Sequence, residues 1–212
     1  MKKLFCLLIT MFMLCISSMA LAASQVGPQI PTSQKIAETY AKTWGTAQSD
    51  MTRVGLLYVN KALTTYDDEI DYRMLSDIVL CVNPKDHKLV DCSSRFADMQ
   101  QMGINDLSLA ERSDLIGVMS KDNLDYAVLI QVNPFIRKER MAMFRYTIEM
   151  TSDIIVKVID MNNNKYLYNG KLSEMAKHGT AVAGVSNKSA VMKVLDIVCP
   201  KIQDIINNVP KG

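Results

Sequence analysis

The sequence predicts an α/β domain that leans toward the α+β class, built on a mixed sheet in a two-layer or three-layer arrangement. Two unbroken apolar runs have the length of strands, and strands covered on both faces have this pattern. Amphipathic segments with helical spacing follow these runs or lie between them, and a later segment alternates apolar with polar residues. The expected order is β-α-β-α-β, then an antiparallel β-hairpin and a C-terminal helix.

The first three predicted strands belong to the parallel part of the sheet. They cover residues 54–59, 87–92 and 126–132. A helix over 67–81 connects the first strand to the second, and a helix over 108–123 connects the second to the third. Two right-handed crossovers place the first strand between the other two, so the predicted spatial order is 2-1-3.

Capping motifs predict where three helices begin. Thr65 with Asp68, and Ser108 with Glu111, have the spacing of a capping box. Ser186 is expected to cap the last helix, which runs through Asn208 with a kink at Pro200.

The hairpin is predicted from alternation within residues 144–175. Apolar side chains share one parity of its first strand and polar side chains the other, so one face is expected to be solvated. The turn is expected at 162–164, and the loop before the hairpin is expected to carry a basic tip at 137–140. The polar parity is formed by Glu149, Thr151, Asp153 and Lys157.

The first residues are typical of an export signal. Residues 1–22 combine Lys2 and Lys3 with a short apolar run and small residues before a cleavage site after about Ala22. A leader over 23–52 with a possible helix and one domain over 53–209 are expected to follow. No mature segment reaches the roughly 20 apolar residues that a membrane span needs. We therefore expect an exported protein of the periplasm or cell envelope.

Charge excludes one class of partner. The chain has 24 Lys and Arg residues against 22 Asp and Glu residues, and removing the signal leaves 22 of each. A neutral mature chain lacks the broad basic footprint of a nucleic-acid-binding protein.

Three cysteines remain in the mature chain, namely Cys81, Cys92 and Cys199. Cys81 and Cys92 are expected to lie at opposite ends of the second strand, beyond the ~7 Å Cα separation that a disulfide allows. Cys81 and Cys199 are the candidates for a disulfide, and buried free thiols are the alternative.

No catalytic residue, metal ligand or cofactor is predicted. The two histidines, His87 and His178, lack the partner spacing of a metal or nucleophile site. Residues 179–189 resemble a phosphate loop, but the lysine is misplaced, which leaves a possible anion site at Ser186 and Ser189. The methionines are better explained as core fillers than as copper ligands.

The order of elements resembles the small envelope α/β domains of the TolB amino-terminal and CsgG type. The resemblance covers about residues 53–209 and includes the entry Asp125-Tyr126 into the third strand. It implies an assembly or adaptor role in the bacterial envelope, without catalytic residues to transfer.

Two functions follow as hypotheses. The first is a non-enzymatic binding, adaptor or assembly module whose partner is another envelope protein or itself. Its contact surfaces are the solvated face and edge of the hairpin and the basic residues Arg137, Lys138 and Arg140. The alternative is a ligand-binding or enzymatic site at the carboxyl ends of the first and third strands, using Asn60, Lys61, Thr64, Thr65 and Asn133.

Overall fold

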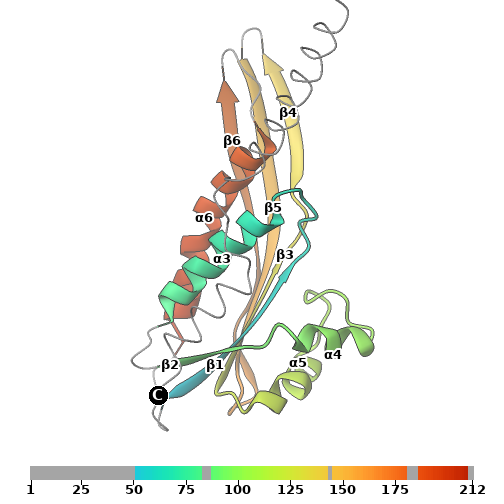
Figure 1. The fold of residues 1–212 in the computed structure, drawn as a ribbon, viewed down its shortest axis with the longest axis vertical. Coiled ribbons are helices and arrows are strands. Elements are labelled where there is room, and N and C mark those ends of the chain that lie inside the picture. Colours follow the sequence, from blue (N-terminus) through green and yellow to red (C-terminus); the bar gives the residue numbers. More distant parts are fainter. Residues whose placement is uncertain (1–50, 83–86, 143–144, 181–185, 210–212) are drawn as a thin grey trace, which may run out of the picture. The chain divides into compact units, whose positions relative to one another are not determined.

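The protein forms one six-stranded mixed sheet with helices on both faces (Figure 1). The structure, a computed structural model, describes residues 51–82, 87–142, 145–180 and 186–209. The expected α/β class is confirmed. The predicted signal and leader helix lie outside the described residues. The strands are β1 (Thr52–Asn60), β2 (His87–Asp91), β3 (Tyr126–Val132), β4 (Ile136–Ala142), β5 (Arg145–Asp160) and β6 (Lys165–Thr180). The helices are α3 (Asp67–Cys81), α4 (Arg95–Gln101), α5 (Arg112–Met119), the 3-10 turn η1 (Ser120–Asp122) and α6 (Asn187–Asn207).

The parallel half of the sheet has the predicted strand order β2-β1-β3. Val54 of β1 lies opposite Leu89 on one side and Tyr126 on the other. Asp125, just before β3, ties the neighbouring strand ends together. Its carboxylate accepts from the backbone N–H of Arg53 at 2.8 Å and from Asn162 Nδ2 at 3.1 Å. The entry into β3 therefore anchors both β1 and the turn after β5.

The antiparallel half extends beyond the ends of β1 and β3. Both β3 and β4 pair antiparallel with β5, with Val132 opposite Ile154 and Ile136 opposite Thr151. Between these two pairs, the segment that joins β3 to β4 has one residue more than the facing segment of β5. Residues 133–135 therefore form a bulge, and β4 continues along the same edge of β5 as β3. The predicted loop at 137–140 is therefore wrong, because these residues belong to β4. Four consecutive charged residues conceal any apolar alternation there.

Helices cover the two faces of the sheet unequally. On one face, α3 and α6 pack Ile70, Met74 and Val194 against β-strand side chains such as Val128 and Ile154. On the other face, α4, α5 and the connecting segments pack Met99, Leu107 and Leu115 onto Leu57 and Leu129. This second cover reaches only the part of the sheet that contains β1 and β3.

The expectation of one solvated face along β5 is therefore only partly correct. Ile155 and Ile159, on the polar parity, are buried under the α4–α5 cover. Lys157 is 3% exposed, and its Nζ donates to the Ala110 carbonyl at 2.8 Å. Burial lowers the pKa of Lys157, because a charged ammonium is disfavoured away from water.

Neither of the two predicted capping boxes forms. At the start of α3, the carboxylate of Asp67 accepts from the backbone N–H and hydroxyl of Thr64, at 2.9 and 2.7 Å. The second helix begins at Arg112 rather than Ser108, whose N–H bonds instead to Asp106. Leu109, expected to face inward, is 81% exposed, and α4 was not predicted. The cap of α6 is confirmed, since Ser186 Oγ accepts from the N–H of Ser189 at 3.1 Å.

Candidate functional site: the open face of the sheet

Beyond the end of β3, the sheet consists of β4, β5 and β6 (Figure 1). Helix α6 packs on one face of β5 and β6. On the opposite face, no element of the described chain covers these strands at the level of Ile136, which is 59% exposed. Residues directly opposite in the register share a face, which identifies the side chains on this uncovered surface. We call this surface the open face; it comprises Ile136, Lys138, Arg140, Glu149, Thr151, Asp153, Lys171, Ser173, Met175 and Lys177.

The two carboxylates of the open face are both neutralised by cations of the same face. The side chain of Glu149 is 5% exposed and lies 3.1 Å from Arg140 Nε and 3.2 Å from Lys177 Nζ. The hydrogen bond from Lys177 lowers the pKa of Glu149, and Arg140 adds to the effect. Asp153 accepts from Lys171 Nζ at 2.8 Å and from Ser173 Oγ at 2.7 Å. Four cations thus face two carboxylates, and the face carries an excess positive charge.

Two apolar side chains add to this basic surface. Ile136 of β4 and Met175 of β6 lie opposite Thr151 from its two sides and are 59% and 46% exposed. In the strand order β4 lies at the end of the sheet, so its outer edge is not paired within the described chain. An unpaired edge offers backbone N–H and C=O groups to another chain.

The three basic residues predicted to contact a partner separate onto two faces. Lys138 and Arg140 belong to the open face. Arg137 lies on the face that α6 covers. Its guanidinium donates hydrogen bonds to Asn187 Oδ1 and, at 2.7 Å, to the Tyr146 hydroxyl. It also forms a salt bridge with Glu139 at 2.5 Å. Arg137 therefore holds β4 to the start of α6.

The predicted ligand-binding residues lie near one end of β1 and β3, and several are engaged in internal hydrogen bonds. The Lys61 N–H donates to the Val132 carbonyl at 2.8 Å, which joins the two strand ends. Asn60 Nδ2 donates to Asp71 at 2.7 Å, and Asn133 Oδ1 accepts from Gln131 at 2.7 Å. Thr64 is bound to Asp67, and Thr65 is exposed. Ligand binding by these five residues stays a prediction.

The predicted anion site is similarly occupied by internal contacts. The Ser189 N–H is used by the Ser186 cap, and Ser189 Oγ lies 3.0 Å from His178 Nδ1. The middle of the phosphate-loop-like segment, residues 181–185, lies outside the described residues. Anion binding at Ser186 and Ser189 stays a prediction.

Cys81, Cys92 and Cys199 are free thiols in this structure. Cys199 Sγ lies 3.6 Å from Met74 Sδ inside the core between α3 and α6. Burial raises the pKa of Cys92 and Cys199 to about 12, so both are neutral thiols at physiological pH. The Cys81–Cys199 disulfide stays a prediction for oxidising conditions. Among the described residues, no group of three His, Cys, Asp or Glu side chains is placed to hold a metal ion.

Sequence reasoning did not single out Lys171, Met175 and Lys177, although the signal was present. These residues share one parity of β6, and Leu172 and Ala176 share the other. Alternation along β5 predicts a solvated side chain at Glu149. Its position between Arg140 and Lys177 depends on the register of β4 and β6, which alternation does not contain.

We expect Glu149→Gln to lower stability at pH 7 and to weaken the dependence of stability on acid pH. The pKa of Glu149 is lowered in the folded state, so its contribution is complete above its unfolded pKa and is lost as pH falls through the folded pKa. The midpoint of urea unfolding, measured from pH 7 to pH 3, should differ between wild type and variant at pH 7, and the difference should shrink as the pH falls toward 3. A constant difference across this range would contradict the assignment.

No protein-family model matches the chain, and no curated protein sequence matches it. Solved structures that align with this chain include the lipoprotein GNA1162 from Neisseria meningitidis, at 12% identity over 72% of this chain and 99% of that one, with a TM-score of 0.38. The C-terminal domain of LpoB from Salmonella enterica has 17% identity over 64% and 91% of the two chains, with a TM-score of 0.31. A minor lipoprotein from Acinetobacter baumannii has 11% identity over 76% and 98%, with a TM-score of 0.37.

Two of these three solved structures are bacterial lipoproteins. In the described part of the chain, no helix has the length and apolar character needed to cross a membrane.

Proposed function

We propose that this protein is a non-enzymatic binding module of the bacterial envelope. In this proposal, the open face and the adjoining edge of β4 hold an acidic segment of another envelope protein. The observation that carries the proposal is the composition of the open face. Its carboxylates are already paired with cations of the same face, and cations remain in excess around two exposed apolar side chains.

The charge of the open face is a local property of the molecule. The chain without its predicted signal has equal numbers of basic and acidic residues, so an excess on one face is balanced elsewhere. Such a patch attracts an oppositely charged surface and orients it during encounter. Arginine and methionine are enriched in protein interfaces, and both occur here as Arg140 and Met175.

The edge of β4 supplies a second kind of contact. A partner segment in extended conformation could add to the sheet beside β4 through main-chain hydrogen bonds. Alternate side chains of that added strand would share the face of Lys138 and Arg140. Acidic residues at those alternate positions would meet cations, which is why we propose an acidic partner.

An envelope location rests on the predicted signal and on the resemblance to TolB amino-terminal and CsgG-type domains. The resemblance also supports the adaptor role. The charge and apolar side chains of the open face do not depend on the signal or on the resemblance. Partner binding by the open face and the envelope location are therefore tested separately.

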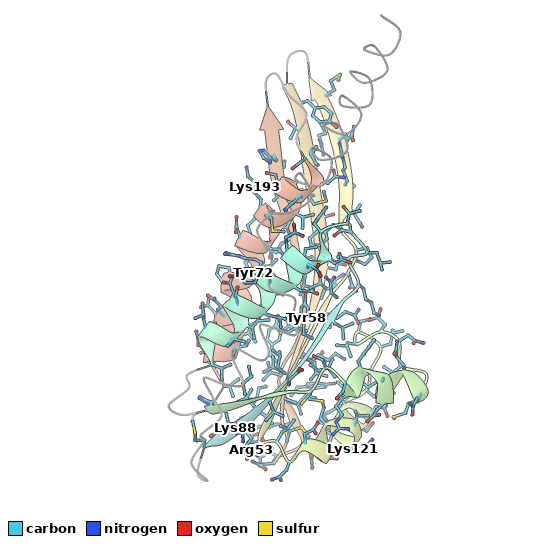
Figure 2. All side chains as sticks on the ribbon, in the orientation of Figure 1. Arg53, Tyr58, Tyr72, Lys88, Lys121 and Lys193 are labelled. Atoms are coloured by element: carbon cyan, nitrogen blue, oxygen red, sulfur yellow. The ribbon has the colours of Figure 1, made fainter. Side chains whose placement is uncertain are left out.

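The contact is tested by site-specific photo-crosslinking in the native bacterium. A photoreactive amino acid at position 138 should capture a partner, and the same group at position 193, an exposed lysine position on α6 (Figure 2), should not. The captured protein should then bind the purified chain less tightly as salt concentration rises. Crosslinks between two copies of this chain, or equal capture from both positions, would contradict the proposal.

Replacement of the exposed apolar pair provides the quantitative test. Ile136→Glu with Met175→Glu should weaken partner binding by at least tenfold, because it removes apolar contact and makes the open face less positive. The matched control is Leu80→Glu with Leu109→Glu, two leucines that are 76% and 81% exposed on other surfaces. Equal affinity for both double variants would show that the open face is not the contact surface.

A further inference from the structure

A second feature of the molecule lies on the face of the sheet that α3 and α6 cover, near β2 and the C-terminal ends of these two helices. There the structure forms a partly open cavity of about 240 Å³. Its walls are largely aliphatic and include Val54, Val82, Ile206 and Val209. An apolar cavity of about 150 Å³ is known to hold a benzene ring, so this one has room for a ring with a substituent.

His87, the first residue of β2, lines this cavity and is buried without a partner. The residue is 7% exposed, and neither Nδ1 nor Nε2 of its imidazole has a hydrogen-bond partner within the described chain. Buried polar atoms are almost always paired, because leaving one unpaired lowers stability. A neutral imidazole offers one acceptor nitrogen and one donor. The histidine therefore has unused hydrogen-bonding capacity at the cavity wall.

Cys81 lines the same cavity, but its thiol is already committed. Its Sγ donates to the Asp77 carbonyl at 2.9 Å. Burial, with Asp77 and Asp204 nearby, raises the pKa of Cys81 to about 11. A neutral, hydrogen-bonded thiol is neither a nucleophile nor a metal ligand. Cys81 and His87 therefore do not form a catalytic pair here.

Two helices end at this cavity. Cys81 is the last residue of α3 and Asn207 the last of α6, and both line the space. The C-terminal end of a helix carries the negative end of the helix dipole and backbone carbonyls without helical partners. This field favours a hydrogen-bond donor inside the cavity.

From these observations we propose that the cavity binds a small, largely apolar molecule that carries a hydroxyl or amino group. The ring or alkyl body lies against the aliphatic walls, and the polar group donates to the acceptor nitrogen of His87. This site is separate from the open face and does not depend on the proposed partner.

The test compares two probes of similar shape that differ in one donor. 4-Methylphenol carries a hydroxyl, and 4-methylanisole carries the same ring with that hydroxyl methylated. Titration of the ¹⁵N-labelled full chain with 4-methylphenol should shift the His87 ring nitrogens and the amides at the ends of α3 and α6. 4-Methylanisole should bind about fivefold more weakly or worse, the effect of one lost hydrogen bond.

Two variants locate the probe. His87→Leu should abolish the preference for 4-methylphenol, and Val209→Phe should fill the cavity and block both probes. Should either variant not fold, the His87 ring nitrogen shifts of the wild-type chain still decide the question. The proposal is overturned if 4-methylphenol leaves these nitrogens unshifted, if His87→Leu keeps the preference, or if folded Val209→Phe binds as well as wild type.

Discussion

Replacing Gln131 by leucine is expected to lower the free energy of unfolding by about 2–4 kcal/mol, because it breaks a buried hydrogen-bond network. Gln131 is fully buried in β3. Its Oε1 accepts from the Leu107 N–H at 2.9 Å, and its Nε2 donates to Asp106 at 3.0 Å and to Asn133 at 2.7 Å. Leucine has a similar size, so the loss of stability comes from the buried polar groups that lose their hydrogen bonds to Gln131. Urea unfolding followed by far-ultraviolet circular dichroism measures the change.

The matched control is Gln100→Leu, an exposed glutamine of α4. It should change stability by no more than about 0.5 kcal/mol. Hydrogen exchange adds a local readout, since the Leu107 amide should lose protection in Gln131→Leu and keep it in the control. If both variants unfold at the same urea concentration, the network contributes nothing to stability.

Gln131 also illustrates the limit of sequence reasoning in this molecule. The apolar run predicts a buried strand over 126–132, and the strand is present. In the sequence Gln131 is a polar interruption of that run. Its partner Leu107 lies 24 residues earlier in a segment without regular structure, and only tertiary packing brings the two together. A pattern along one strand predicts a face, but it does not predict what covers that face.

The same limit explains which predictions about the open face are confirmed and which are incorrect. Alternation along β5 correctly predicts two distinct faces, because side chains of a strand alternate. It does not predict that Ile155 and Lys157 are covered by α4 and α5 while Thr151 and Asp153, a few residues away, remain partly exposed. The strand order 2-1-3 is predictable because the handedness of crossovers restricts it. The placement of β4 required the pairing of Ile136 with Thr151, which no local pattern contains.

The second large effect is expected at Gly55, in the central strand β1. A Cβ atom at this position would lie 2.3 Å from Leu124 Cδ1 and 3.0 Å from Cys92 Sγ. Gly55→Val should therefore lower the free energy of unfolding by about 3 kcal/mol, although valine suits strands better than glycine. Gly117→Val is the control, since a Cβ there meets no atom within 4 Å. That variant should be unchanged or slightly more stable, because glycine is the poorer helix former.

A double mutant distinguishes steric overlap from a backbone effect at Gly55. Leu124 is buried, and Leu124→Ala alone should cost about 2–5 kcal/mol through the cavity that it leaves. Valine at position 55 adds three carbons where alanine at position 124 removes three, so each change compensates the volume of the other. The double variant should therefore be more stable than the sum of the two single effects by at least about 1 kcal/mol. Strict additivity would mean that Leu124 does not limit the space at Gly55, and that the close packing of β1 against the segment before β3 is not the reason for glycine in this strand.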